Sequence, residues 1–191
     1  MNTLKKAAKI EFEERKSKFI GYATPVSSKK EAEDFILSIK MRHLDATHNC
    51  SAYKVIDGGQ EYFKTDDNGE PSGTAGKPMG DIITYMGVDN VAVVATRYFG
   101  GIKLGAGGLV RNYAKTAKLA IQEAGIEEYV EKYTYLIEFN YDKISEIDNI
   151  LGANSEILDK GYNDKVTYKI KIDEKTYKTL NCLQDIILIE L

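Results

Sequence analysis

VAVVATRYFGGIKLGAGGLVRNYAKTAK, residues 91–118, decides how the first half of this chain folds. Its opening run, Val91–Ala95, is continuously apolar, which predicts a central strand buried on both faces. Five glycines in residues 100–108 then allow positive φ angles and close approach of the backbone to a ligand. A helix follows, and Gly125 ends it. The apolar residues expected on its buried stripe are Val110, Tyr113, Ala114, Ala117, Ile121 and Ala124.

The same stretch is the candidate site for a negatively charged ligand. The first amides of a helix lack intrahelical partners and attract anions. No Asp or Glu occurs in residues 90–122, and three cations recur at i, i+4 and i+7 along the helix. A basic stripe alone is usually a solvated helix face, so the glycine-rich start is the distinguishing feature. The predicted anion-binding residues are Arg97, Lys103, Gly105, Gly107, Gly108, Arg111, Lys115 and Lys118, joined by Thr74 and Lys77 if their loop folds over the helix start.

Upstream of this stretch, hydrophobic periodicity predicts strands and one helix. Alternation in Lys9–Arg15 and in Phe19–Thr24 indicates two antiparallel strands. A capping box predicts a helix from Lys29 to Met41. His48–Ile56 and Glu61–Thr65, separated by a glycine turn, are typical of a β-hairpin.

The loop Asp66–Lys77 lacks apolar periodicity and precedes a short helix, Met79–Met86. Its Asp66, Asp67 and Glu70 are weak candidates for holding Mg²⁺, although an acidic turn that needs its glycines is the commoner explanation. The sequence around Gly76 and Gly105 departs from the P-loop and dinucleotide-binding patterns.

Histidine and cysteine give no catalytic prediction. His43 and His48 are too few for a zinc site, and no third group supports a nucleophilic pair of His48 and Cys50. We therefore predict no catalytic residue and no cofactor.

The last third of the chain predicts a second, smaller domain. After a linker at Glu127–Lys132, the order is strand, helix, strand, strand, helix, strand, which is the βαββαβ ferredoxin-like pattern. The expected fold class is α+β, with domains at 1–128 and 133–191. The predicted elements of the second domain are Tyr133–Asn140, Lys143–Leu151, Glu156–Tyr162, Lys165–Ile172, Lys175–Leu183 and Ile186–Glu190.

Charge and cysteine content narrow the classes of function. The net charge is −3, and residues 129–191 carry 8 basic against 12 acidic side chains, which leaves the rest of the chain close to neutral. Positive charge is concentrated in the acid-free residues 90–122. No signal peptide or membrane span is recognisable, and two distant cysteines favour reduced thiols. We expect a cytoplasmic protein.

Four segments together carry a resemblance to a known family. They are KFIG (18–21), HNCSAY (48–53), DNGEPSGTAGKP (67–78) and RYFGGIKLGAGGLVR (97–111), and they resemble the IMPACT/YigZ family, bacterial YigZ type. The resemblance implies a first domain like ribosomal protein S5 domain 2 and a ferredoxin-like second domain similar to the last domain of elongation factor G. Eukaryotic members of this family regulate translation, whereas no settled activity is implied for the bacterial type.

These observations favour a non-catalytic protein that acts near translation and contacts RNA or ribosome-associated factors through the basic stretch. One alternative is an enzyme that binds a phosphate or nucleotide with metal assistance. Another is a regulator of translation that docks a protein partner. No membrane partner is expected.

Overall fold

The computed structural model describes residues 1–152 and 155–191. It divides into two compact units, Met1–Tyr129 and Val130–Leu191, each with its own hydrophobic core. Helices and mostly antiparallel strands are mixed in both units, which confirms the predicted α+β class. Within the described ranges, no helix is both long and apolar enough to cross a membrane.

Unit 1 is built on a five-stranded sheet in the order β2-β3-β6-β4-β5, and every neighbouring pair is antiparallel. Strand β6 lies at the centre, as its continuous apolar run predicts, and nearly all of its residues are buried. The elements of the sheet and its helices are β2 (Ala8–Glu14), β3 (Ser17–Pro25), α1 (Lys29–Arg42), β4 (His48–Asp57), β5 (Gln60–Asp66), α2 (Gly76–Tyr85), β6 (Val91–Tyr98) and α3 (Ala106–Ala124).

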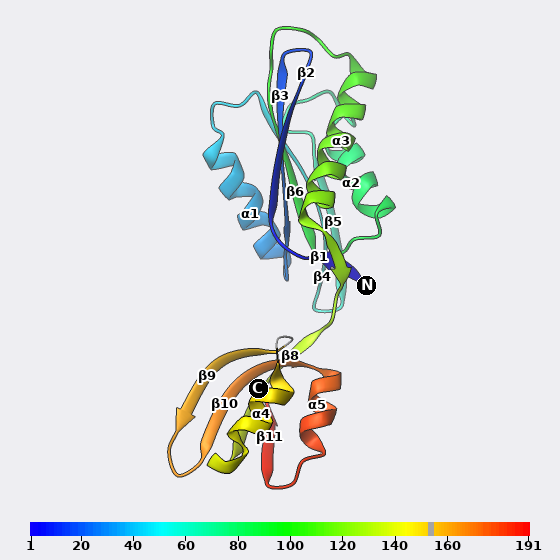
Figure 1. Cartoon of the computed structure of the whole chain (residues 1–191). Helices are drawn as coiled ribbons and strands as arrows, with labels where there is room; N and C mark the ends of the chain where they lie inside the picture. Colours follow the sequence, from blue (N-terminus) through cyan, green and yellow to red (C-terminus); the bar gives the residue numbers. More distant parts are fainter. Residues whose placement is uncertain (153–154) are drawn as a thin grey trace. The chain divides into compact units, whose positions relative to one another are not determined.

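The two faces of this sheet are covered unequally. Helices α2 and α3 pack on one face, over the larger core, and α1 alone packs on the other (Figure 1). Helix α1 lies over β4 and β6, so it leaves the edge strand β5 less covered. This asymmetry creates two distinct surfaces on unit 1.

Helix α3 is rotated slightly from its predicted orientation. Val110, expected in the buried stripe, is 38% exposed, and Leu109 is buried in its place. Leu109 and Tyr113 lie one turn apart and both enter the core with Met79 of α2. Positions 109 and 110 are both apolar, so the pattern alone could not choose between them.

A short strand pair was missed by the sequence patterns. The N-terminal β1 (Asn2–Leu4) pairs antiparallel with β7 (Ile126–Glu128), which overlaps the predicted linker. Three residues are too few to show alternation, although Leu4 is buried in the core of unit 1.

Unit 2 has the βαββαβ element order that the sequence predicts. Its antiparallel sheet runs β11-β8-β10-β9, and the inward residues of β8 and β10 form its core. Asp173 caps helix α5 by accepting a hydrogen bond from the Thr176 amide at 2.7 Å. The elements are β8 (Lys132–Phe139), a 3₁₀ turn (Tyr141–Lys143), α4 (Ile144–Leu151), β9 (Glu156–Tyr162), β10 (Val166–Asp173), α5 (Glu174–Asn181) and β11 (Ile186–Glu190).

Candidate anion-binding face

The loop between β6 and α3 is anchored against the β2–β3 hairpin. A Cβ added to Gly100 would lie 1.7 Å from the Lys16 carbonyl oxygen, so only glycine permits this contact. The Gly100 amide also donates to the Ser17 hydroxyl at 3.4 Å. The hairpin turn and the glycine loop are therefore held side by side.

Helix α3 begins with uncapped amides. Its first residue follows Gly105, which has a φ of +72° and supplies no side-chain cap. The Leu109 amide bonds the Gly105 carbonyl at 2.9 Å, and the first turn contains no acidic residue. Gly105 and Gly107 are exposed. The start of α3 is thus accessible to an anion.

The cations of α3 lie at this exposed start and along the helix. The Arg111 guanidinium lies beside the first turn, since a Cβ on Gly107 would be 3.5 Å from its Nη1. The Lys115 ammonium lies 4.2 Å from the centre of the Phe12 ring on β2. Lys103, Arg111, Lys115 and Lys118 are all exposed, and none has a carboxylate within 4.0 Å in the part of the chain that the structure describes.

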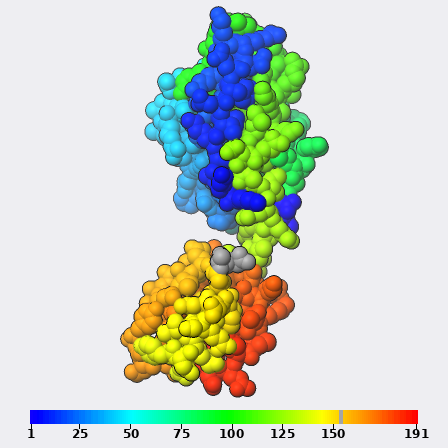
Figure 2. All heavy atoms as spheres, in the orientation of Figure 1, coloured from blue at the N-terminus to red at the C-terminus, as the bar shows by residue number. Residues whose placement is uncertain are grey.

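Two further cations join them from the hairpin. Arg15 and Lys16 form the β2–β3 turn with φ angles of 46° and 64°, and both are exposed. Figure 2 shows the hairpin beside α3 on one face of unit 1. Sequence reasoning missed these two residues because the contact between Lys16 and Gly100 joins segments more than 80 residues apart. We call the surface formed by Arg15, Lys16, Lys103, Gly105, Gly107, Arg111, Lys115 and Lys118 the basic face.

Arg97 does not belong to the basic face, contrary to the prediction. It is 5% exposed and donates from Nη1 to Glu70 Oε1 at 2.7 Å. Nη2 donates to the Ser17 hydroxyl at 3.3 Å, and Cζ lies 5.7 Å from the centre of the Phe19 ring and 5.4 Å from that of Phe99. The reason is that β6 continues past Ala95, so Arg97 still lies in a buried strand and requires a buried acid.

Glu70, one of the weak candidates for metal binding, is the centre of a buried polar cluster. Besides Arg97, its Oε1 accepts a hydrogen bond from the Tyr113 hydroxyl at 2.7 Å. His48 Nε2 lies 3.8 Å from Oε2, and His48 Nδ1 is 2.8 Å from the Asn68 carbonyl. Glu70 therefore links the acidic loop, β6 and α3.

The other two metal candidates are also engaged. Asp67 accepts hydrogen bonds from the amides of Gly73, Ala75 and Gly76 at 2.7 to 3.0 Å, so it caps the start of α2. Asp66 pairs with Lys40 at 2.8 Å. Burial acts to raise the pKa of Asp66, but hydrogen bonds from Lys40 and from the backbone of Asn68 hold it below its usual value. No cluster of three metal-binding side chains occurs among the described residues.

Three predicted anion-binding residues are placed elsewhere or covered. Thr74 is buried and donates to the Pro71 carbonyl at 2.6 Å, which closes a turn. Lys77 lies in α2 and pairs with Asp81 at 2.8 Å, because the Asp67 cap starts that helix at Gly76. Gly108 is buried, and a Cβ there would lie 3.0 Å from the Leu104 side chain.

Cys50 is not arranged as a nucleophile. It is fully buried, its thiol donates to the Asp67 carbonyl, and burial raises the pKa of the thiol to about 12. Burial likewise raises the pKa of Tyr113, which contacts the same cluster. Both groups stay protonated at neutral pH, so the Cys50 thiol is not activated for nucleophilic attack.

Comparison with known proteins identifies relatives along most of the chain. The family model described as the Impact N-terminal domain matches residues 15–121. The IMPACT family member YvyE of Bacillus subtilis (strain 168) is 39% identical over 174 residues, covering 91% of this chain and 80% of the relative. The IMPACT family member YigZ of Escherichia coli (strain K12) is 32% identical over 161 residues, covering 83% and 78%. A crystal structure of a hypothetical protein aligns with a TM-score of 0.64 and 26% identity, covering 100% of this chain and 96% of that one.

Proposed function

We propose, since this chain belongs to the IMPACT family, that it is a translation-linked binding protein whose basic face contacts RNA or ribosome phosphates. The family resemblance supplies the link to translation. The observation that supports phosphate binding is the accessible start of α3, with the Arg111 guanidinium beside it and no carboxylate within 4.0 Å of the α3 cations among the described residues. Such action near ribosomes would take place in the cytoplasm.

The electrostatics of the basic face favour a polyanion over a single small anion. Six cations from the hairpin, the loop and α3 contribute to it, spread over several turns of helix. A chain of phosphates contacts such a spread surface at several points, and each contact releases counterions. We expect dissociation constants of about 10⁻⁴ to 10⁻⁶ M for single-stranded RNA at physiological salt.

Titration of a fluorescent single-stranded RNA tests the proposal. The Arg111→Ala/Lys115→Ala/Lys118→Ala variant should bind more weakly, and the slope of log K against log salt should shrink by about 2, since each phosphate contact contributes about 0.7. A matched control removes three exposed lysines of unit 2, Lys169, Lys171 and Lys175, and should retain the wild-type slope. Equal affinity and slope in the basic-face variant and the wild type would reject RNA binding through this face.

A protein partner is the second candidate, because apolar side chains are exposed on and beside the same loop. Phe99, Ile102 and Val110 are 45%, 42% and 38% exposed. Apolar groups among cations are typical of protein interfaces as well as of RNA-binding surfaces. Binding of a translation factor that survives nuclease treatment and about 0.5 M salt, but is lost in Phe99→Ala, would favour protein docking.

A further inference from the structure

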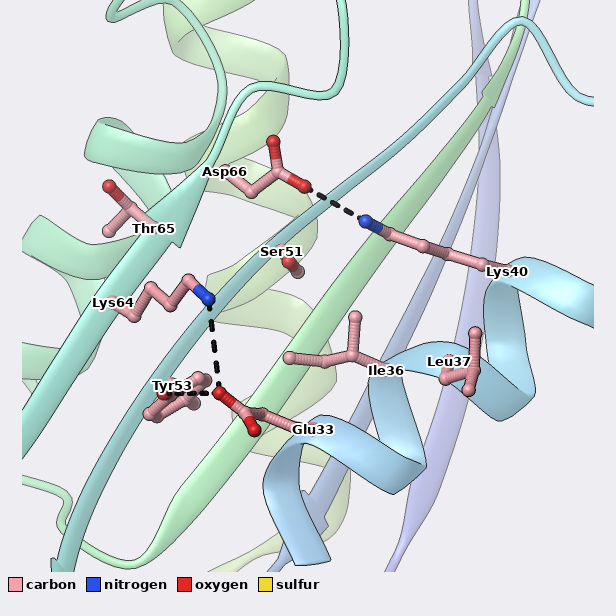
Figure 3. A pocket seen from close by; sticks show the side chains of 9 residues that line it. All are labelled: Glu33, Ile36, Leu37, Lys40, Ser51, Tyr53, Lys64, Thr65 and Asp66. Atoms are coloured by element: carbon pink, nitrogen blue, oxygen red, sulfur yellow. Dashed lines mark hydrogen bonds and ion pairs between the residues drawn. The ribbon is translucent and has the colours of Figure 1, made fainter. Parts of the chain in front are cut away.

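Unit 1 has a hollow on the face of the sheet opposite the basic face. It has a volume of about 490 Å³, within the range of small-ligand sites. It lies between α1 and the strands β4 and β5, where α1 leaves the edge of the sheet less covered. Figure 3 shows the side chains that line it: Glu33, Ile36, Leu37 and Lys40 of α1, Ser51 and Tyr53 of β4, and Lys64, Thr65 and Asp66 of β5.

One wall of the hollow is apolar. Leu37 is 58% exposed although it is a large apolar side chain, and Ile36 beside it is half-buried. The Tyr53 ring, only 3% exposed, adds an aromatic surface, and its hydroxyl donates to Glu33 at 3.3 Å. A ligand with an apolar body would remove this wall from water.

The polar groups of the hollow provide hydrogen-bond donors. Among the described residues, the only carboxylate within 4.0 Å of the Lys64 ammonium is that of Glu33. Their distance of 3.8 Å is too long for a hydrogen bond. Lys40 uses one of its three N–H donors on Asp66 at 2.8 Å. The Ser51 side chain, 4% exposed, lies between these two lysines in Figure 3. The acceptor that suits such donors is a carboxylate.

The charge balance of the lining favours a ligand group with a single negative charge. The two lysines and the two acids, Glu33 and Asp66, give the lining a net charge of zero. Glu33 and Asp66 repel a phosphate with two negative charges about twice as strongly as a carboxylate with one. A single carboxylate therefore suits the free donors of Lys64 better. Asp66 also holds the Lys40 side chain in place before binding.

We propose that this hollow binds a carboxylate carried on an apolar body. Two sources share this chemistry: a free small carboxylic acid and the C-terminal end of a peptide. The site is independent of RNA or protein binding by the basic face, because it uses other residues on the other face of the sheet.

Titration by ¹H–¹⁵N NMR of the whole chain tests this proposal, with N-acetyl-leucine as the probe. We expect saturable shifts of the Leu37, Ser51 and Lys64 amides. N-acetyl-leucinamide, which has the same body without the charge, should bind at least about tenfold more weakly. Lys64→Met should weaken binding by about tenfold, and Lys30→Met, which changes the same charge on the outer side of α1, should not.

A tetrapeptide ending in a free leucine carboxylate separates the two sources. Tighter binding than N-acetyl-leucine assigns a peptide C-terminus, and equal or weaker binding assigns a free acid. Ser51→Ala provides a second variant of the lining for the same titration, because it removes only a hydroxyl group from a buried position and so preserves the fold. No saturable shift at the lining residues, or equal affinity for the acid and its amide, would overturn the proposal.

Discussion

The buried pair of Glu70 and Arg97 predicts a large loss of stability when one partner is neutralised. The Glu70 side chain is 3% exposed and the Arg97 side chain 6%, and the pair is joined at 2.7 Å. In Glu70→Gln, the shape is preserved but the guanidinium keeps its charge without a counter-charge. Leaving such a charge unpaired costs about 3–5 kcal/mol. The Tyr113 hydroxyl also exchanges a charged acceptor for a neutral one.

Urea unfolding followed by NMR measures this loss separately for each unit. With an m-value of about 2 kcal/mol/M, a loss of about 4 kcal/mol lowers the midpoint of unit 1 by roughly 2 M. The Ala117 amide reports unit 1 and the Ile170 amide reports unit 2, whose midpoint should not change. The matched control is Glu61→Gln, which removes the exposed carboxylate 3.4 Å from Lys54. Because Lys54 keeps its pair with Asp89 at 2.7 Å, this change should shift the midpoint by less than about 0.5 M.

A second substitution distinguishes an unpaired charge from simple loss of packing. Adding Arg97→Met to Glu70→Gln removes the orphaned charge, so the double variant should recover much of the lost stability. If Glu70→Gln shifted the midpoint no more than Glu61→Gln does, the claim that Arg97 depends on Glu70 as its buried counter-charge would be wrong.

Three further predictions concern other contacts. Gly100→Ala places a methyl group against the Lys16 carbonyl, so it should destabilise unit 1 by about 1–3 kcal/mol in urea unfolding and weaken RNA binding by displacing the hairpin. Asp173→Ala should lower the stability of unit 2 by about 1 kcal/mol at neutral pH. Hydrogen bonds from Thr176 hold the pKa of Asp173 below its usual value, so the difference should vanish as the pH falls through that lowered pKa. Burial lowers the pKa of His43 below 6.5, so its neutral form contributes stability that is full above pH 6.5 and lost as the pH falls through the lowered pKa. Between about pH 7 and pH 5, unit 1 of the wild type should therefore lose more stability than unit 1 of the His43→Gln variant in the same unfolding assay.

The sequence predicted the order of the main elements because each carries a local signal. The apolar run of β6, the capping box of α1 and the alternation in β2 and β3 are patterns within single segments. The Ser28 hydroxyl accepts a hydrogen bond from the Glu31 amide at 3.1 Å, as the capping box predicts. In contrast, β1 and β7 form only by pairing with each other from distant ends of unit 1, so no local sequence pattern predicts them.

The candidate site was predicted only in part for the same reason. The exposure of four predicted cations could be recognised from the sequence, because charged residues on a helix or loop usually face the solvent. These are Lys103, Arg111, Lys115 and Lys118. The burial of Arg97 could not be predicted, because it depends on the partner Glu70, which is 27 residues away in a loop without periodicity. Carboxylates in that loop suggested a metal site, but their partners are amides, a lysine and an arginine that only the fold brings together.

The five-stranded sheet makes the two proposed sites of unit 1 electrically independent. The α3 cations of the basic face and the hollow beside α1 lie on opposite faces of the sheet, with α2 and α3 on one side and α1 on the other. A helix is about 10 Å across, so the width of α3 together with the sheet separates the exposed α3 cations from the hollow by more than the Debye length of about 8 Å at physiological salt. Removing three cations from α3 should therefore leave the affinity of the hollow for N-acetyl-leucine unchanged. A change in that affinity would mean that the sites communicate through the packed core rather than through their charges.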